Sequence, residues 1–261
     1  MKNEAVQYHR EKNVGIITLN RPERLNAINP DLLSGLINQL NVASEDEDVV
    51  SVILTGAGKS FCAGEDLKET QAGKSISQWE QEIGALQDTQ RVILKLGKPL
   101  IGAIKGYAVG GGLEFALSCD IRIAAEDARF GFPETGVGLT ITGAGTKLIS
   151  QLVGLGKAKE LVFTGEIINA QQALQIGLVN RVVPGDQLLE ASLNLCERIG
   201  RNSPLSLKLS RMALDEGLHS SFEQTLALEA EHLLACAKAG NQEKFVAHKL
   251  TEMKKKSDSQ K

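Results

Sequence analysis

The sequence predicts an α/β fold followed by a helical C-terminal region. Short apolar runs of strand length alternate with longer segments of helical period over the first two thirds of the chain, and only helical periods follow. The 261 residues, 42% of them hydrophobic, are enough to bury one large core. We therefore assign residues 1–200 to an α/β core that carries the functional site, and residues 201–261 to a helical region.

Four β-rich runs are expected to form strands. They are residues 14–19, 49–56, 99–109 and 121–125. Most of them carry apolar side chains at successive positions, which is typical of strands buried on both faces. The chain turns helical after residues 178–184.

The first long helix is expected between the first two of these strands. Asn29 can cap its N-terminus, and Pro30 suits the first helical turn. Behind them runs one apolar stripe: Leu32, Leu33, Leu36, Ile37 and Leu40.

A second long helix is expected between the second and third strands. Ser77 and Glu80 have the spacing of a capping box, and Gly97 marks the end. The stripe on this helix consists of Trp79, Ile83, Leu86, Gln90 and Ile93. In the C-terminal third, Ser203-Pro204 is expected to start a further helix, and two more carry apolar residues from Phe222 and from Phe245 onward.

Charge and composition exclude several classes of function. Formal net charge is −3, from 29 basic and 32 acidic residues, and no basic stripe indicates nucleic acid as a partner. No apolar stretch approaches the ~20 residues of a membrane span. The charged N-terminal sequence has no apolar signal core, so a cytoplasmic location is expected.

The cysteines and histidines predict no metal site. Cys62, Cys119, Cys196 and Cys236 form no CxxC pair, and the four histidines fall in no ligand spacing. We expect the cysteines to be small apolar packing residues in a reducing compartment.

Three glycine-containing junctions stand out: FCAGEDLKE (61–69), VGGGLEFAL (109–117) and TGAGTKL (142–148). None matches a phosphate-binding loop or a dinucleotide fingerprint. Two interpretations remain open. The glycines either allow tight packing, or they let a ligand reach backbone N–H groups, which at the start of a helix are free donors.

Two glutamates favour the second interpretation. Glu114 follows the three glycines in an otherwise apolar helix, and Glu134 lies in FGFPETGVG. A carboxylate among apolar residues is costly unless it is paired or protonated. Two such groups beside a pair of N–H donors suit proton transfer next to a carbonyl.

Together these residues closely resemble the enoyl-CoA hydratase (crotonase) family. The resemblance covers roughly residues 10–250 and includes ITLNRPERLNAIN (17–29), FCAGEDLKE, the stretch 104–138 and GLVNRVV (177–183). It implies a crotonase-like spiral of ββα units whose helical C-terminal region mediates trimerisation, as a homotrimer or a hexamer made of two trimers. It also implies an acyl-CoA thioester as the substrate and no separate cofactor.

The resemblance assigns roles to individual residues. The backbone N–H groups of Glu65 and Gly111 would form an oxyanion hole for the thioester oxygen. Glu114 and Glu134 would flank the double bond, Glu114 as the base toward water and Glu134 as the acid at C2. For CoA and substrate binding the candidates are Arg24, Ala63, Asp66, Leu67 and Lys68, although Asp66 also suits a structural role in its loop.

Three positions depart from the family pattern. Glu65 stands where a small or apolar residue is usual, so its carboxylate would oppose a developing anion unless it points away. Thr142 stands where a glycine is usual, which affects the placement of water. The C-terminal sequence TEMKKKS lacks a common family ending and puts contacts from a neighbouring subunit to CoA in doubt.

The expected activity is hydration of a trans-2-enoyl-CoA to a 3-hydroxyacyl-CoA. The alternatives are another reaction on the same scaffold, namely double-bond isomerisation, decarboxylation or thioester hydrolysis, or a non-catalytic acyl-CoA-binding or RNA-associated protein. A serine hydrolase is disfavoured because no GxSxG motif is present.

Overall fold

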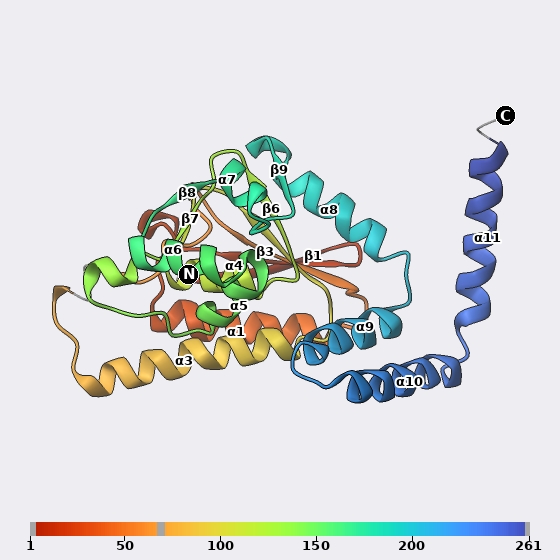
Figure 1. The fold of residues 1–261 in the computed structure, drawn as a ribbon. Helices are drawn as coiled ribbons and strands as arrows, with labels where there is room; N and C mark the ends of the chain where they lie inside the picture. The colour runs from red at the N-terminus through yellow and green to blue at the C-terminus, as the bar shows by residue number, and fades with distance from the viewer. Residues whose placement is uncertain (1–3, 67–70, 259–261) are drawn as a thin grey trace.

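A computed structural model of the chain describes residues 4–66 and 71–258. Its centre is a six-stranded sheet flanked by helices (Figure 1). In spatial order the strands are β1 (Val6–Glu11), β2 (Val14–Leu19), β3 (Ser51–Gly56), β4 (Leu100–Ile104), β6 (Ile121–Ala125) and β9 (Arg181–Val183). β1 pairs antiparallel with β2, and the other neighbours are parallel. The predicted α/β class is confirmed.

A smaller three-stranded sheet holds β5 (Tyr107–Val109), β7 (Arg129–Gly131) and β8 (Ile168–Asn169). The single strand expected over 99–109 is therefore wrong, because the chain leaves the large sheet at Gly106 and enters the small one. Gly106 has φ +53°, and a Cβ there would lie 1.9 Å from the carbonyl oxygen of Lys59. Only glycine fits this turn.

The strands expected over 14–19 and 121–125 are confirmed residue for residue. β1 carries no sequence signal because it is an edge strand, with mostly polar, solvent-facing side chains. β7 and β8 have only three and two residues, too few to show a period.

The first long helix, α1 (Pro30–Glu45), begins as predicted. The side-chain oxygen of Asn29 accepts a hydrogen bond from the N–H of Leu32 at 2.9 Å. The second, α3 (Ile76–Lys95), begins one residue earlier than its predicted cap. The capping box expected at Ser77 and Glu80 is wrong, because Ser75 and Gln78 make the reciprocal bonds instead.

Two apolar clusters cover the two faces of the large sheet. Alternate residues of β2 show the division, since Ile17 and Leu19 belong to the larger cluster with α1 and α3, and Val14 and Ile16 to the smaller. The smaller cluster is covered by Leu195 and Cys196 of α8 (Leu188–Ile199). The strands are thus buried on both faces, as their continuous apolar runs predict.

The structure describes further helices besides α1, α3 and α8. They are α4 (Gly111–Ser118), α5 (Gly145–Val153), α6 (Leu155–Thr164), α7 (Ala170–Gln175), α9 (Pro204–Gly217), α10 (Phe222–Lys238) and α11 (Gln242–Asp258), with 3-10 turns at Pro22–Arg24, Pro133–Val137 and Gly185–Gln187. The predicted start at Ser203-Pro204 is confirmed. Figure 1 shows α10 and α11 extending away from the sheets, with α11 far from the core.

Candidate active site

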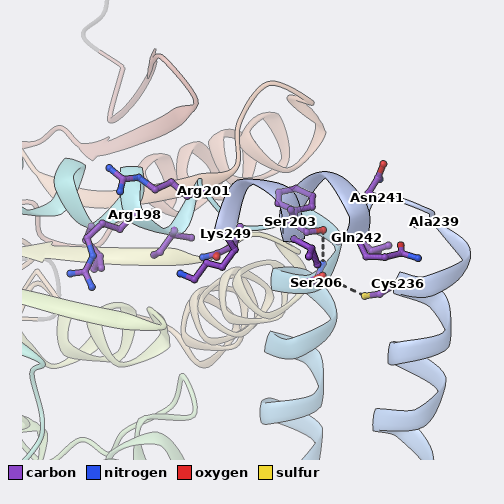
Figure 2. Close-up of a pocket in the computed structure, with 15 residues that line it drawn as sticks. Arg198, Arg201, Ser203, Ser206, Cys236, Ala239, Asn241, Gln242 and Lys249 are labelled. Atoms are coloured by element: carbon purple, nitrogen blue, oxygen red, sulfur yellow. Dashed lines mark hydrogen bonds between the residues drawn. The ribbon is translucent and has the colours of Figure 1, made fainter. Parts of the chain in front are cut away.

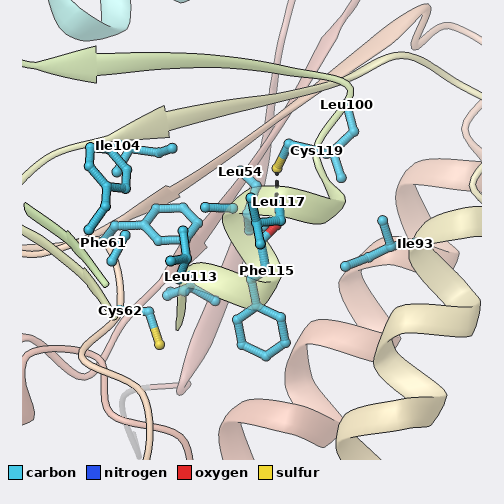
Figure 3. Packing of buried hydrophobic residues seen from close by; sticks show 14 of the residues in the cluster. Leu54, Phe61, Cys62, Ile93, Leu100, Ile104, Leu113, Phe115, Leu117 and Cys119 are labelled. Carbon is cyan, nitrogen blue, oxygen red and sulfur yellow. Dashed lines mark hydrogen bonds between the residues drawn. The ribbon is translucent and has the colours of Figure 1, made fainter. Parts of the chain in front are cut away.

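Helix α4 is the buried centre of the site. Figure 3 shows Leu113, Phe115 and Leu117 of this helix packed among core side chains from several elements. At its start, a Cβ on Gly112 would lie 2.1 Å from the carbonyl oxygen of Cys62. The glycine therefore lets the helix N-terminus lie directly against the segment that follows β3.

The first and second glycine junctions meet at Gly64. This residue has φ +76°, and a Cβ on it would lie 2.5 Å from the oxygen of Val109 and 3.3 Å from the backbone nitrogen of Gly111. Parallel bridges pair Cys62 with Ala108 on one side and Glu65 with Ile28 on the other. Gly111 is the first residue of α4, where N–H groups have no acceptor within the helix.

Glu65 and Gly111 line the same cavity, whose volume is about 290 Å³. Glu114 and Glu134 line it as well. Its apolar wall comes from α1 and α3 and includes Leu33, Ile83 and Leu86. Four predicted site residues from three separate segments are therefore brought together around one space.

Glu114 is 1% exposed and is held by the third glycine junction. Its Oε1 accepts hydrogen bonds from the N–H groups of Gly143 at 2.5 Å and Gly145 at 3.1 Å. Burial raises the pKa of Glu114 to about 7; the two N–H donors oppose this shift and the charge of Glu134 adds to it. The group therefore changes protonation state near neutral pH.

Glu134 lies in the 3-10 turn after β7. Its Oε2 is buried and has no hydrogen-bond partner in the described part of the chain. Its Oε1 faces the α4 entry, since a Cβ on Gly110 would lie 3.1 Å from it. Burial raises the pKa of Glu134, so its protonated form is favoured relative to a carboxyl in water.

The residues proposed to bind CoA lie either away from this cavity or in the first glycine-containing junction. Arg24 is exposed at the end of a 3-10 turn and does not line the cavity. Ala63 donates its N–H to the carbonyl of Leu25 at 3.0 Å, which ties the first glycine loop to the segment before α1. Asp66 is buried, as a structural loop residue would be. Leu67 and Lys68 lie outside the described residues.

Sequence reasoning missed two charged residues, one that lines this cavity and one that pairs with its lining. Lys74 lies just before α3 and forms ion pairs with Glu65 and with Glu82, a residue that lines the cavity. A lysine in a polar stretch gives no sequence signal of burial. Thr142, the second departure from the family pattern, also lines the cavity.

The cysteine predictions hold in part. All four cysteines are free, and Cys62, Cys119 and Cys196 are buried, whereas Cys236 is half-buried. Burial raises the pKa of the Cys62 thiol to about 12, so it is no nucleophile at neutral pH.

Within residues 4–66 and 71–258, no cluster of His, Cys, Asp or Glu could hold a metal ion. In the same residues, no helix is long and apolar enough to cross a bilayer.

The six-stranded and three-stranded sheets, with a glycine-rich helix entry and two carboxylates at one cavity, define an α/β protein of the crotonase class. The family model "Enoyl-CoA hydratase/isomerase" matches residues 9–255. The chain belongs to the enoyl-CoA hydratase/isomerase family. The family resemblance inferred from the sequence is confirmed.

Relatives and solved structures agree with this assignment. The chain is 42% identical over 237 residues to the short-chain-enoyl-CoA hydratase of Clostridium acetobutylicum, covering 90% of each chain. It is 38% identical to the crotonyl-CoA hydratase of Syntrophomonas wolfei, over 90% of this chain and 91% of that one. The crystal structure of an enoyl-CoA hydratase from Bacillus anthracis superposes with a TM-score of 0.85 at 38% identity, covering 88% and 89% of the two chains. The expected crotonase-like fold is thereby confirmed.

Proposed function

We propose that this protein is an enoyl-CoA hydratase that adds water across the 2,3 double bond of a short-chain trans-2-enoyl-CoA. Family membership and the names of the relatives support an enoyl-CoA substrate. One observation carries the proposal: Glu114 and Glu134 line the same cavity as the Glu65–Gly111 junction. Isomerases of the family usually lack the first of these glutamates, which favours hydration over isomerisation.

The thioester oxygen is proposed to bind between the backbone N–H groups of Glu65 and Gly111. The close approach of Gly64 to Gly111, and the presence of Glu65 and Gly111 at the same cavity, support this proposal. Negative charge on the oxygen is favoured there because Gly111 begins a helix, whose N-terminus is the positive end of the dipole. Each such donor contributes roughly 10²–10³ in rate.

The two carboxyl groups then have different tasks. Ionised Glu114 takes a proton from water as the water oxygen attacks C3, and electron density moves through C2 to the thioester oxygen. Protonated Glu134 gives its proton to C2 as the enolate collapses. Exchange with solvent returns each group to its starting form, so the net change is the addition of one water.

The hydrogen bonds support this division of roles. Two N–H donors stabilise the Glu114 anion, as a base requires. The Oε2 of Glu134, which has no hydrogen-bond partner among residues 4–66 and 71–258, is suited to carry a proton. Arg24, Ala63, Asp66, Leu67 and Lys68 remain proposed contacts to CoA or substrate, and the reaction as written uses no further cofactor.

The test is an assay of the purified protein with crotonyl-CoA. We expect loss of the enoyl-thioester absorbance together with formation of 3-hydroxybutanoyl-CoA, identified by mass. Release of free CoA, loss of CO₂ from a carboxylated acyl-CoA or a shifted double bond without water uptake would instead assign a different reaction of the same scaffold. Binding of crotonyl-CoA without turnover would contradict an enzymatic role.

We further propose that residues 201–261 mediate assembly into a homotrimer or a hexamer of two trimers. No residue of α9 or α10 is buried in the single chain, and several large apolar side chains there are exposed: Leu214, Leu218, Phe222, Leu233 and Leu234. A second cavity, of about 970 Å³, is lined by residues of α8 to α11 and the turns between them. Figure 2 shows these lining residues as sticks. We expect light scattering to give three or six times the chain mass, and a monomer would contradict the proposal.

A cytoplasmic location is also proposed, because the four free cysteines fit a reducing compartment.

A further inference from the structure

Lys74 is a buried cation that pairs with two residues of the wall of the proposed catalytic cavity but does not itself line it. Its side chain is only 8% exposed. The ammonium donates to Oε1 of Glu65 and, at 2.6 Å, to Oε2 of Glu82, and it lies 4.8 Å from the ring centroid of Trp79. Glu65, Trp79 and Glu82 all line the cavity that holds the two catalytic glutamates.

These contacts explain how the chain tolerates a glutamate at position 65. The carboxylate of Glu65 is paired with Lys74, so a cation lies beside its charge close to the proposed oxyanion hole. Burial lowers the pKa of Lys74, but the hydrogen bonds to Glu65 and Glu82 outweigh this effect and raise it. The lysine is therefore a cation throughout the working pH range.

The ion triad Glu65–Lys74–Glu82 gives one part of the cavity wall a charged character. One cation faces two carboxylates, so these three groups together carry a net charge of about −1. Outside the triad, the wall has a polar part with Glu114 and Glu134 and an apolar part that includes Ile28, Leu33, Ile83 and Leu86. A short acyl chain can contact the apolar part of the wall alone, whereas a longer chain that reaches the triad removes water from paired charges.

We propose that the Glu65–Lys74–Glu82 triad restricts the acyl group to short, uncharged chains. Long alkyl chains are disfavoured because they desolvate the triad without replacing its hydrogen bonds. Acyl groups that end in a carboxylate are disfavoured because the triad carries excess negative charge. This inference rests on the proposed function, and it names the residues that set the acyl preference within it.

The test compares kcat/KM for crotonyl-CoA with that for trans-2-decenoyl-CoA. Replacing the triad in the variant Glu65→Ala/Lys74→Met/Glu82→Leu is expected to raise the decenoyl-to-crotonyl ratio at least tenfold. The double variant Lys157→Met/Glu160→Leu removes an exposed ion pair on α6 and serves as the matched control, with an unchanged ratio. An unchanged ratio in the folded triad variant would overturn the proposal.

A single variant separates charge from shape. Glu82→Gln keeps the hydrogen bond to Lys74 and makes the triad neutral. We expect kcat/KM for an enoyl-CoA ending in a carboxylate to rise at least fivefold relative to crotonyl-CoA, with the decenoyl ratio changing less than twofold. No gain for the carboxylate substrate would contradict the charge argument, even if the triple variant failed to fold.

Binding measurements keep this test independent of turnover. Calorimetry with butanoyl-CoA and decanoyl-CoA reports the same preference whether or not the protein hydrates enoyl-CoA. If wild-type protein failed to hydrate crotonyl-CoA but bound butanoyl-CoA in preference to decanoyl-CoA, and the triad variant lost that preference, the function would be wrong and the triad assignment right.

Discussion

Glu114→Gln is expected to lower kcat for crotonyl-CoA hydration ~10²–10⁴-fold, the usual contribution of a positioned general base. The amide oxygen of glutamine can still accept from Gly143 and Gly145, so the loop around the site should keep its geometry. Glutamine has no basic group, and the attacking water then keeps its proton. Steady-state kinetics measure the loss, and KM should change by less than the rate does.

The pH profile distinguishes a lost base from a distorted site. In the wild type, kcat/KM should fall below about pH 7, because Glu114, whose pKa burial raises to about 7, becomes protonated and can no longer accept a proton. The residual activity of Glu114→Gln should lack this acidic limb. Glu160→Gln, a change in an exposed ion pair, should leave rate and profile unaltered. If Glu114→Gln hydrated crotonyl-CoA at the wild-type rate, the two-carboxylate mechanism would be ruled out.

Gly64→Ala is expected to lower kcat/KM by at least ~10², the contribution of one oxyanion-hole donor. Alanine disfavours φ +76°, and its Cβ would lie 2.5 Å from the oxygen of Val109, which no real Cβ tolerates. The loop therefore has to move, and the N–H of Glu65 moves with it relative to that of Gly111. Steady-state kinetics measure the loss of kcat/KM. The variant is first shown to be folded by a circular dichroism spectrum that matches the wild type.

Gly84→Ala is the matched control for this change. Gly84 lies within α3, and a Cβ there meets nothing within 4 Å. Alanine at that position should leave turnover intact and stabilise the helix by ~1 kcal/mol. If Gly64→Ala turned over crotonyl-CoA as fast as Gly84→Ala, the convergence of Glu65 and Gly111 on one oxygen would be contradicted.

Much of the fold follows from local sequence. The apolar runs of β2 and β6 predict their strands to the residue, and Asn29-Pro30 predicts the start of α1, because these signals lie within a few neighbouring positions. Prediction fails where a contact distant in sequence decides. Gly106 splits the expected strand 99–109 because the Lys59 carbonyl lies against it. The predicted start of α3 is wrong for a local reason, because two possible capping boxes overlap and Gln78, rather than Glu80, reaches back to the cap.

The sequence by itself determined the α/β class, the family and the glutamates to examine, because runs, caps and motifs are read between near neighbours along the chain. Only the tertiary structure decided that Glu114 is buried and held by Gly143 and Gly145, and that Glu65 is paired with Lys74. Burial and charge pairing depend on segments that fold together from distant parts of the chain. The pKa of a base and the chemistry of a cavity wall are therefore set by packing, which no short stretch of sequence encodes.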